Sequence, residues 1–147
     1  MEQRFDVGQL IPAGYKAMLG VHSYVQGCGL DLGLLELVRL RASQINGCAF
    51  CVAMHIPLAR QHGLSEHQVN LVATWKEAPV FSPRERAALA WTEAVTVLVG
   101  QEVPESVYAQ VQAQFTPEEV ANLTLCVGEI NTWNRLMVAS RTPPVLA

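Results

Sequence analysis

Helix-start signals recur along this sequence and constrain its fold more than any other feature. Ser65, Ser82 and Thr116 are each followed three residues later by Gln or Glu, which is the capping-box pattern of a helix N-terminus. Proline directly follows Ser82 and Thr116, and proline is favoured at the first helical position. No segment alternates apolar and polar residues between turn signals, as a half-buried strand would. The sequence therefore predicts an all-α fold.

About seven helices account for the apolar segments between these signals. Their expected ranges are Pro12 to about Gln26, Leu32 to Ile45 with Asp31 as N-cap, Cys48 to His62, Ser65 to about Lys76, Ser82 to about Val99, Pro104 to Gln114, and Thr116 to about Ala139. The chain has 147 residues and a mass of 16.1 kDa. This length suits one hydrophobic core, so we expect a single domain over residues 1–147.

The charge of the chain argues against nucleic acid as a partner. The formal net charge is −3 and the sequence pI is about 5.8, and no cluster of Lys and Arg could follow a phosphate backbone. The longest run without formal charge, Ala42–Ala59, contains polar side chains and Pro57, so no membrane span is expected. The N-terminal segment lacks an apolar signal-peptide region, and the four cysteines form no disulfide framework. These features favour a reducing, cytoplasmic location.

The segment from Gly47 to His55 contains the clearest candidate site. In a helix, Cys48, Cys51 and His55 lie at positions i, i+3 and i+7 on one stripe. The breaker pair Asn46–Gly47 places Cys48 in the first turn, where free N–H groups and the helix dipole favour a thiolate. The thiolate is the reactive form of cysteine, and His55 can accept the Cys51 proton. This pattern predicts a dithiol redox site.

Two other interpretations of the cysteine pair follow from the residues alone. Two buried cysteines can serve as small hydrophobic side chains. Cys48, Cys51 and His55 could also be three zinc ligands with Cys28 or Cys126 as a fourth, although structural zinc sites usually bring two separated ligand pairs. Otherwise Cys28 is expected in a loop and Cys126 in the core. Thioredoxin-like chemistry would need a βαβ context, which an all-α chain lacks.

Other polar residues and one apolar helix have structural interpretations. Glu36 taken alone is an exposed helix carboxylate that pairs with Arg39 at i+3. His22 and His67 are expected at surface positions of helices. The segment Leu32–Leu40 is apolar around most of its circumference, more than one core-facing stripe requires. Since 50% of all residues are hydrophobic, this segment predicts a homo-oligomer.

The spacing of four residues resembles a known family signature. Glu36, Cys48, Cys51 and His55 follow the pattern of a glutamate, eleven residues, a cysteine, two residues, a cysteine, three residues and a histidine. This pattern resembles that of the alkylhydroperoxidase D-like branch of the carboxymuconolactone decarboxylase family.

The resemblance extends through residues 82–93 and 130–136, which look like later helices of that family. It implies an all-helical protomer that assembles into a homo-trimer or homo-hexamer, and a thiol-dependent peroxidase or disulfide-reducing role. It also implies a proton relay between Glu36 and His55. Phe50 departs from the best-known members, which carry a second histidine between the cysteines. The decarboxylase branch generally lacks the cysteine pair, which counts against lactone decarboxylation.

The combined prediction is a peroxidase that acts on a hydroperoxide and needs neither cofactor nor metal. One thiolate attacks the peroxide and becomes a sulfenic acid, and the second thiol condenses with it to a Cys48–Cys51 disulfide that an external dithiol or thiol protein reduces. The helix dipole favours Cys48 as the attacking residue, whereas His55 lies nearer to Cys51, and the resemblance implies Cys51. The alternatives are a carboxymuconolactone decarboxylase-like lyase and a non-enzymatic metal-binding or redox-sensing oligomer.

Glu36 and His55 would meet if the helices on either side of Asn46–Gly47 fold back as a hairpin. At a rise of about 1.5 Å per residue, the two residues lie at comparable distances from that turn. A carboxylate beside the imidazole would hold its tautomer and make it a better base for the Cys51 proton.

Overall fold

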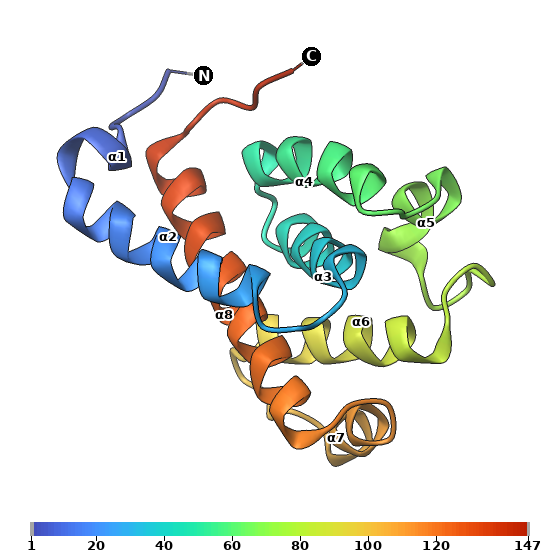
Figure 1. Cartoon of the computed structure of the whole chain (residues 1–147). Coiled ribbons are helices and arrows are strands. Elements are labelled where there is room, and N and C mark those ends of the chain that lie inside the picture. The colour runs from blue at the N-terminus through green and yellow to red at the C-terminus, as the bar shows by residue number, and fades with distance from the viewer. Residues whose placement is uncertain (1, 147) are drawn as a thin grey trace.

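A computed structural model describes residues 2–146, and all of their regular structure is helical (Figure 1). These residues form eight α-helices and one 3-10 helix: α1 (Val7–Leu10), α2 (Pro12–Gln26), α3 (Leu32–Ile45), α4 (Ala49–Gln61), α5 (Glu66–Leu71), η1 (Val72–Thr74), α6 (Pro83–Thr96), α7 (Glu105–Gln112) and α8 (Pro117–Ser140). The all-α prediction is confirmed. The additional helix, α1, is a four-residue helix capped by Asp6, too short to produce a periodic pattern. None of the helices in this range is both long and apolar enough to cross a bilayer.

The three capping boxes form as the sequence predicts. The side chains of Ser65, Ser82 and Thr116 each accept a hydrogen bond from the backbone N–H three residues on. The Gln or Glu at that position accepts in return from the N–H of the cap residue. Asp31 caps the start of α3 with its carboxylate, as predicted. The helix spans Leu32–Ile45, which is also the predicted range. Local side-chain chemistry therefore sets most helix starts.

Two helices end at least three residues earlier than predicted, and α7 ends two residues earlier, at Gln112. α5 ends at Leu71, and the chain continues through a 3-10 turn to Thr74 rather than as an α-helix. α6 ends at Thr96 rather than near Val99. Residues 95–97 are all β-branched, and such residues lose side-chain freedom in a helix, which weakens its last turn.

Helix α3 lies at the centre of the fold, packed against α4, α6 and α8 (Figure 1). Every residue from Gly33 to Leu40 is buried, including the charged Glu36 and Arg39. Gly33 permits a close approach to the end of α4, because a Cβ there would lie 2.8 Å from the His62 carbonyl oxygen. The all-round apolar surface of α3 is thus covered within one chain. The inference from this surface to a homo-oligomer is therefore wrong, and the oligomer itself stays a prediction.

A small hydrophobic cluster encloses the cysteine pair. Cys48 and Cys51 pack with Val7 of α1 and Met137 of α8. Partly buried side chains from α2, α4 and α8 complete this cluster: Tyr15, Phe50, Trp133 and Leu136. Helix α2 packs along α8 (Figure 1), so residues from both ends of the sequence cover the start of α4.

Candidate functional site

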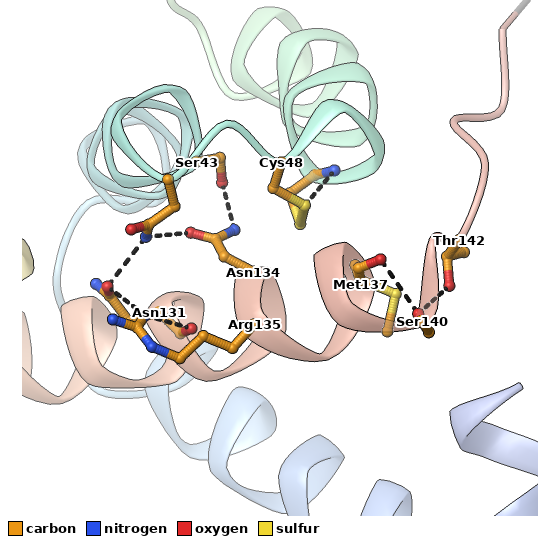
Figure 2. The surroundings of a disulfide bond; sticks show 10 residues. Ser43, Cys48, Asn131, Asn134, Arg135, Met137, Ser140 and Thr142 are labelled. Atoms are coloured by element: carbon orange, nitrogen blue, oxygen red, sulfur yellow. Dashed lines mark hydrogen bonds between the residues drawn. A yellow bond between two sulfur atoms is a disulfide. The ribbon is translucent and has the colours of Figure 1, made fainter. Parts of the chain in front are cut away.

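The cysteine pair begins helix α4, with Cys48 just outside the first turn. Gly47 has a φ of 66°, which glycine adopts without strain and which turns the chain from α3 into α4. Cys48 has an extended backbone and is the N-cap, so its predicted place inside the first turn is wrong by one residue. Its Sγ accepts a hydrogen bond from the Cys51 N–H at 3.3 Å (Figure 2). A sulfur at this position still meets the free N–H groups that favour a thiolate.

Cys48 and Cys51 form a disulfide with their Cα atoms 5.3 Å apart. The other two cysteines lie elsewhere, as predicted: Cys28 is half-buried beyond the end of α2, and Cys126 is buried in a different core cluster. Burial raises the pKa of Cys126 to about 12, so it stays a thiol at neutral pH. Residues 2–146 contain no group of three or more His, Cys, Asp or Glu side chains arranged to hold a metal ion. Cys28 and Cys126, the fourth ligands that the zinc interpretation named, belong to a different cluster from the Cys48–Cys51 pair.

Amide side chains hold the turn between α3 and α4 against α8 (Figure 2). Asn46 Nδ2 donates to Asn131 Oδ1 at 3.0 Å and to Asn134 Oδ1 at 2.9 Å. Asn134 Nδ2 donates in turn to Ser43 Oγ at 3.0 Å. These hydrogen bonds join the end of α3 to the middle of α8, and so place the first residues of α4 beside α8.

His55 and Glu36 meet across the hairpin that α3 and α4 form. His55 Nδ1 lies 2.7 Å from Glu36 Oε2, and the two side chains are only 3% and 2% exposed. A carboxylate can only accept a hydrogen bond, so Nδ1 carries a proton, and in the neutral imidazole the lone pair is on Nε2. This Nε2 is buried, and no described residue hydrogen-bonds to it. The arrangement leaves a base with a free acceptor atom inside the protein.

Glu36 is buried, which corrects its interpretation as an exposed carboxylate. It does pair with Arg39 as predicted, since Oε1 accepts from Arg39 Nη1 at 2.9 Å. Burial alone would raise the pKa of Glu36, but the hydrogen bond and charge of His55 and the charge of Arg39 outweigh it and lower that pKa. Glu36 is therefore a carboxylate at neutral pH, with each oxygen bonded to a different partner.

Arg39 joins Glu36 to a second carboxylate, Glu129 of α8. Its side chain is fully buried; Nη1 also donates to Gln26 Oε1 at 2.8 Å, and Nη2 donates to Glu129 Oε2 at 3.1 Å. The other oxygen of Glu129 lies 2.6 Å from His22 Nδ1. Burial would raise the pKa of Glu129, but the hydrogen bond from His22 and the charge of Arg39 lower it. Two histidine–carboxylate pairs thus share one guanidinium.

Both histidines line one cavity of about 180 Å³ beside Cys51. Its reactive and polar lining consists of Cys51, His55, His22 and Glu129. The rest is predominantly apolar: Tyr15, Leu19, Phe50, Met54, Ile130, Trp133 and Met137. Because a cavity of about 150 Å³ accommodates a benzene ring, this one suits a small organic molecule.

Cys48 lines a different hollow, an open groove of about 280 Å³. Residues 141–144, which follow α8, form one side of this groove. Cys51 is not among its lining residues, and Cys48 is not among those of the cavity with His55. The two cysteines of one disulfide, each only 1% exposed, thus line different hollows.

Four residues of this arrangement were predicted as site residues: Glu36, Cys48, Cys51 and His55. Arg39 was predicted only as a partner of Glu36, and the roles of His22 and Glu129 were not predicted. His22 has a side chain that is 36% exposed, which agrees with its predicted surface position, but its contact with Glu129 and its place in the cavity wall were not predicted. A signal for Arg39 was present: a helix that is apolar on all sides is buried, and a charge on it needs a partner. His22 and Glu129 are 107 residues apart, and no local pattern connects them.

The chain is similar to a family sequence model, to a bacterial protein sequence and to solved protein structures. Residues 12–94 match the sequence model of the carboxymuconolactone decarboxylase family. The uncharacterized protein YdfG of Bacillus subtilis (strain 168) is 34% identical over 139 residues, which are 95% of each chain. A crystal structure of a protein of unknown function from Agrobacterium tumefaciens, proposed to be the antioxidant defence protein AhpD, has a TM-score of 0.96 and 40% identity over 99% of this chain and 100% of that chain.

A more distant structure shares the fold. The AhpD core of an uncharacterized peroxidase-related protein from Ralstonia eutropha JMP134 has a TM-score of 0.81 and 23% identity, over 92% of this chain and 72% of that chain. At this identity the likeness shows the fold alone.

Replacing Arg39 should strongly destabilise the protein. We expect Arg39→Met to lower the free energy of unfolding at neutral pH by about 3–5 kcal/mol, because buried Glu36 and Glu129 lose their shared counter-charge. Urea denaturation followed by circular dichroism measures this change. Arg135→Met, at an exposed arginine of α8, is the control and should change the free energy of unfolding by less than about 0.5 kcal/mol.

The difference in the free energy of unfolding between wild type and Arg39→Met should become smaller at low pH. The pKa values of Glu36 and Glu129 are lowered, so their contribution to stability is present above the ordinary glutamate value of about 4.3 and is lost as the pH falls through the lowered values. Without Arg39 the two carboxyl groups protonate more readily and then need no counter-charge. If the free energies of unfolding of the two proteins differ by as much at about pH 4 as at neutral pH, then Arg39 stabilises the protein by packing alone and not by its charge.

Proposed function

This chain belongs to the carboxymuconolactone decarboxylase family, in its alkylhydroperoxidase D-like branch, and on that basis we propose that it is a thiol-dependent peroxidase. The observation that carries the proposal is the Cys48–Cys51 disulfide, whose Cys51 shares a cavity with the Glu36-bound His55. A cysteine pair that cycles between dithiol and disulfide is what such a peroxidase requires. A decarboxylating lyase has no use for it, because its reaction needs an acid and a base but no redox couple.

The proposed cycle begins when the Cys51 thiolate attacks the terminal oxygen of a hydroperoxide. An S–O bond forms and the O–O bond breaks, so the sulfur is oxidised to a sulfenic acid and the peroxide is reduced to an alcohol. The Cys48 thiol then attacks the Cys51 sulfur, which closes the disulfide and releases the hydroxyl group as water. The size and apolar lining of the cavity favour a small organic hydroperoxide. The cycle uses no cofactor and no metal.

Cys51 is assigned the attack because it, and not Cys48, lines the cavity that contains His55. Cys51 and His55 are four residues apart on α4, which puts their Cβ atoms about 5–6 Å apart on one face of the helix. His55 Nε2, buried without a hydrogen-bond partner among the described residues, would accept the thiol proton. Glu36 is the positioning residue, since its hydrogen bond holds the imidazole ring and its tautomer.

An external dithiol or a thiol protein completes the cycle by reducing the disulfide. The groove at Cys48 offers that sulfur a separate approach, beside residues 141–144. A reductant thiolate that attacks Cys48 forms a mixed disulfide and releases Cys51 beside His55, and the second reductant thiol then displaces Cys48. Such reductants are maintained in reducing compartments, which supports a cytoplasmic location.

Cysteine substitutions test this cycle with tert-butyl hydroperoxide and dithiothreitol. We expect Cys51→Ser to abolish turnover and to form no sulfenic acid that dimedone can trap. Cys48→Ser should lose most of its turnover but accumulate a sulfenic acid on Cys51, located by mass spectrometry of the dimedone adduct. Cys28→Ser, a substitution outside the cavity and the disulfide, is the matched control and should keep its turnover.

The alternatives give different results with the same proteins. A dimedone adduct on Cys48 in Cys51→Ser would exchange the roles of the two cysteines. Stoichiometric oxidation without turnover would indicate a redox sensor, and zinc retained after chelator-free purification would indicate a metal-binding protein. Carbon dioxide release from γ-carboxymuconolactone, undiminished in Cys51→Ser, would indicate a lyase.

His55 and Glu36 should control the reactivity of Cys51 toward alkylation. We expect His55→Gln and Glu36→Gln to move the iodoacetamide alkylation curve of Cys51 to higher pH, because the thiol loses its proton acceptor or the support of that acceptor. Peroxide reduction should slow by about 10²–10⁴-fold. His67→Gln, at an exposed histidine of α5, is the control. Superimposable curves for wild type and both variants would mean that neither residue acts on the thiol.

Self-association into a homo-trimer or homo-hexamer is also part of the proposal. Only Val25 of α2 is buried, and four large apolar residues of α1, α2 and their junction are exposed: Leu10 at 69%, Ile11 at 51%, Leu19 at 43% and Tyr24 at 56%. Burying apolar surface stabilises by about 25 cal/mol per Å², which favours covering this face with another copy. Light scattering at micromolar concentration should give the mass of a trimer or larger. A mass of 16.1 kDa would contradict this.

A further inference from the structure

A second histidine–carboxylate pair, His22 and Glu129, lines the same cavity as Cys51 and His55. His22 Nδ1 lies 2.6 Å from Glu129 Oε1, and Glu129 is buried. Because the carboxylate accepts the Nδ1 hydrogen, Nε2 is the atom left for a bound molecule. The His22 side chain is 36% exposed, whereas that of His55 is 3% exposed. The cavity therefore has one histidine sealed inside it and one in contact with solvent.

The buried network that holds the two histidines contains one more carboxylate than guanidinium. Glu36 and Glu129 carry two negative charges, and Arg39, which bonds to both, carries one positive charge. With both histidines neutral, one buried negative charge is uncompensated, and such a charge is costly. One imidazolium makes the network neutral. Water reaches the His22 side chain, whereas the His55 side chain is sealed inside the protein.

We propose that His22 is the general acid of the peroxidase reaction, donating its Nε2 proton to the oxygen that leaves the hydroperoxide while His55 holds the proton of Cys51. This inference rests on the proposed peroxidase function. In the step, the Cys51 sulfur bonds to the terminal oxygen, the O–O bond breaks, and the alkoxide takes the His22 proton and becomes the alcohol. Between the resting dithiol and the sulfenic acid, His55 gains the thiol proton and His22 gives its proton to the alkoxide. The network of Glu36, Arg39, Glu129 and the two histidines therefore has the same total charge before and after the reaction.

The walls of the cavity assign the acid to His22 rather than His55. In a displacement at oxygen, the leaving group departs on the side opposite the attacking sulfur. His55 is on the same helix as Cys51, one turn further along, and so lies on the side of the nucleophile. His22 comes from α2, a different wall of the same cavity. Phe50, the lining residue between the two cysteines, carries no proton that could serve instead.

The test compares two peroxides that differ in their need for an acid. An alkoxide leaving from tert-butyl hydroperoxide is a strong base and needs a proton as it departs, whereas the acetate leaving from peracetic acid does not. We expect His22→Gln to slow single-turnover oxidation of reduced protein by tert-butyl hydroperoxide by about 10²–10⁴-fold. Oxidation by peracetic acid should slow by less than about tenfold. Stopped-flow fluorescence follows the reaction, since Trp133 lines the cavity.

Control variants separate this role from a structural one. His67→Gln, on exposed α5, should leave both rates unchanged. His55→Gln should slow both peroxides, because it lowers the amount of thiolate. The alkylation curve of Cys51 should not move to higher pH in His22→Gln, as it does in His55→Gln, since His22 does not take the thiol proton.

Other results would contradict either the role of His22 or the peroxidase function itself. If His22→Gln slows both peroxides equally, or neither, then His22 is not the general acid, while the peroxidase function stands. If wild-type protein is oxidised by peracetic acid and tert-butyl hydroperoxide without forming the Cys48–Cys51 disulfide, the proposed function fails and the role of His22 fails with it.

Discussion

A single buried guanidinium organises the candidate site. Arg39 bonds to one oxygen of Glu36 and one oxygen of Glu129, and each carboxylate uses its other oxygen for a histidine. The carboxylates are therefore held between a fixed cation and a histidine, and cannot turn without losing one of the two. Because the electrostatic attraction acts in a poorly hydrated interior, these pairs are stronger than they would be on the surface. The position of both imidazoles at the cavity depends on this arrangement.

Helix α3 carries this network because it is buried on every side. A helix at the surface would expose one face, and its charges would be hydrated and mobile. In α3 the charges of Glu36 and Arg39 lie three residues apart among buried leucines, so each depends on the other and on neighbouring helices for compensation. Helix α3 is thus both the centre of the core and the element that carries the central charges of the site.

Local chemistry explains what could be predicted from the sequence. Cap residues and prolines act within one turn, so the starts of α3, α5, α6 and α8 follow from a few residues each. The contact of Glu36 with His55 also has a local origin, because a short turn joins their helices. The pairing of His22 with Glu129 depends instead on how α2 packs on α8, which no short pattern encodes. The burial of Glu36 was missed for a related reason: the apolar surface of α3 was assigned to another protein copy rather than to the core of this one.

The weak attachment of α2 has a consequence for the dynamics of the site. This helix supplies Tyr15, Leu19 and His22 to the cavity wall, yet only one of its residues is buried, whereas α3 is enclosed along most of its length. Elements with few buried contacts open locally at a lower free energy than the core, so the amide hydrogens of α2 should exchange with solvent sooner than those of α3. His22 on α2 and Glu36 on α3, the residue that positions His55, therefore belong to parts of different local stability. In an assembly that covers α2, dilution would loosen the wall at His22 before it affects His55.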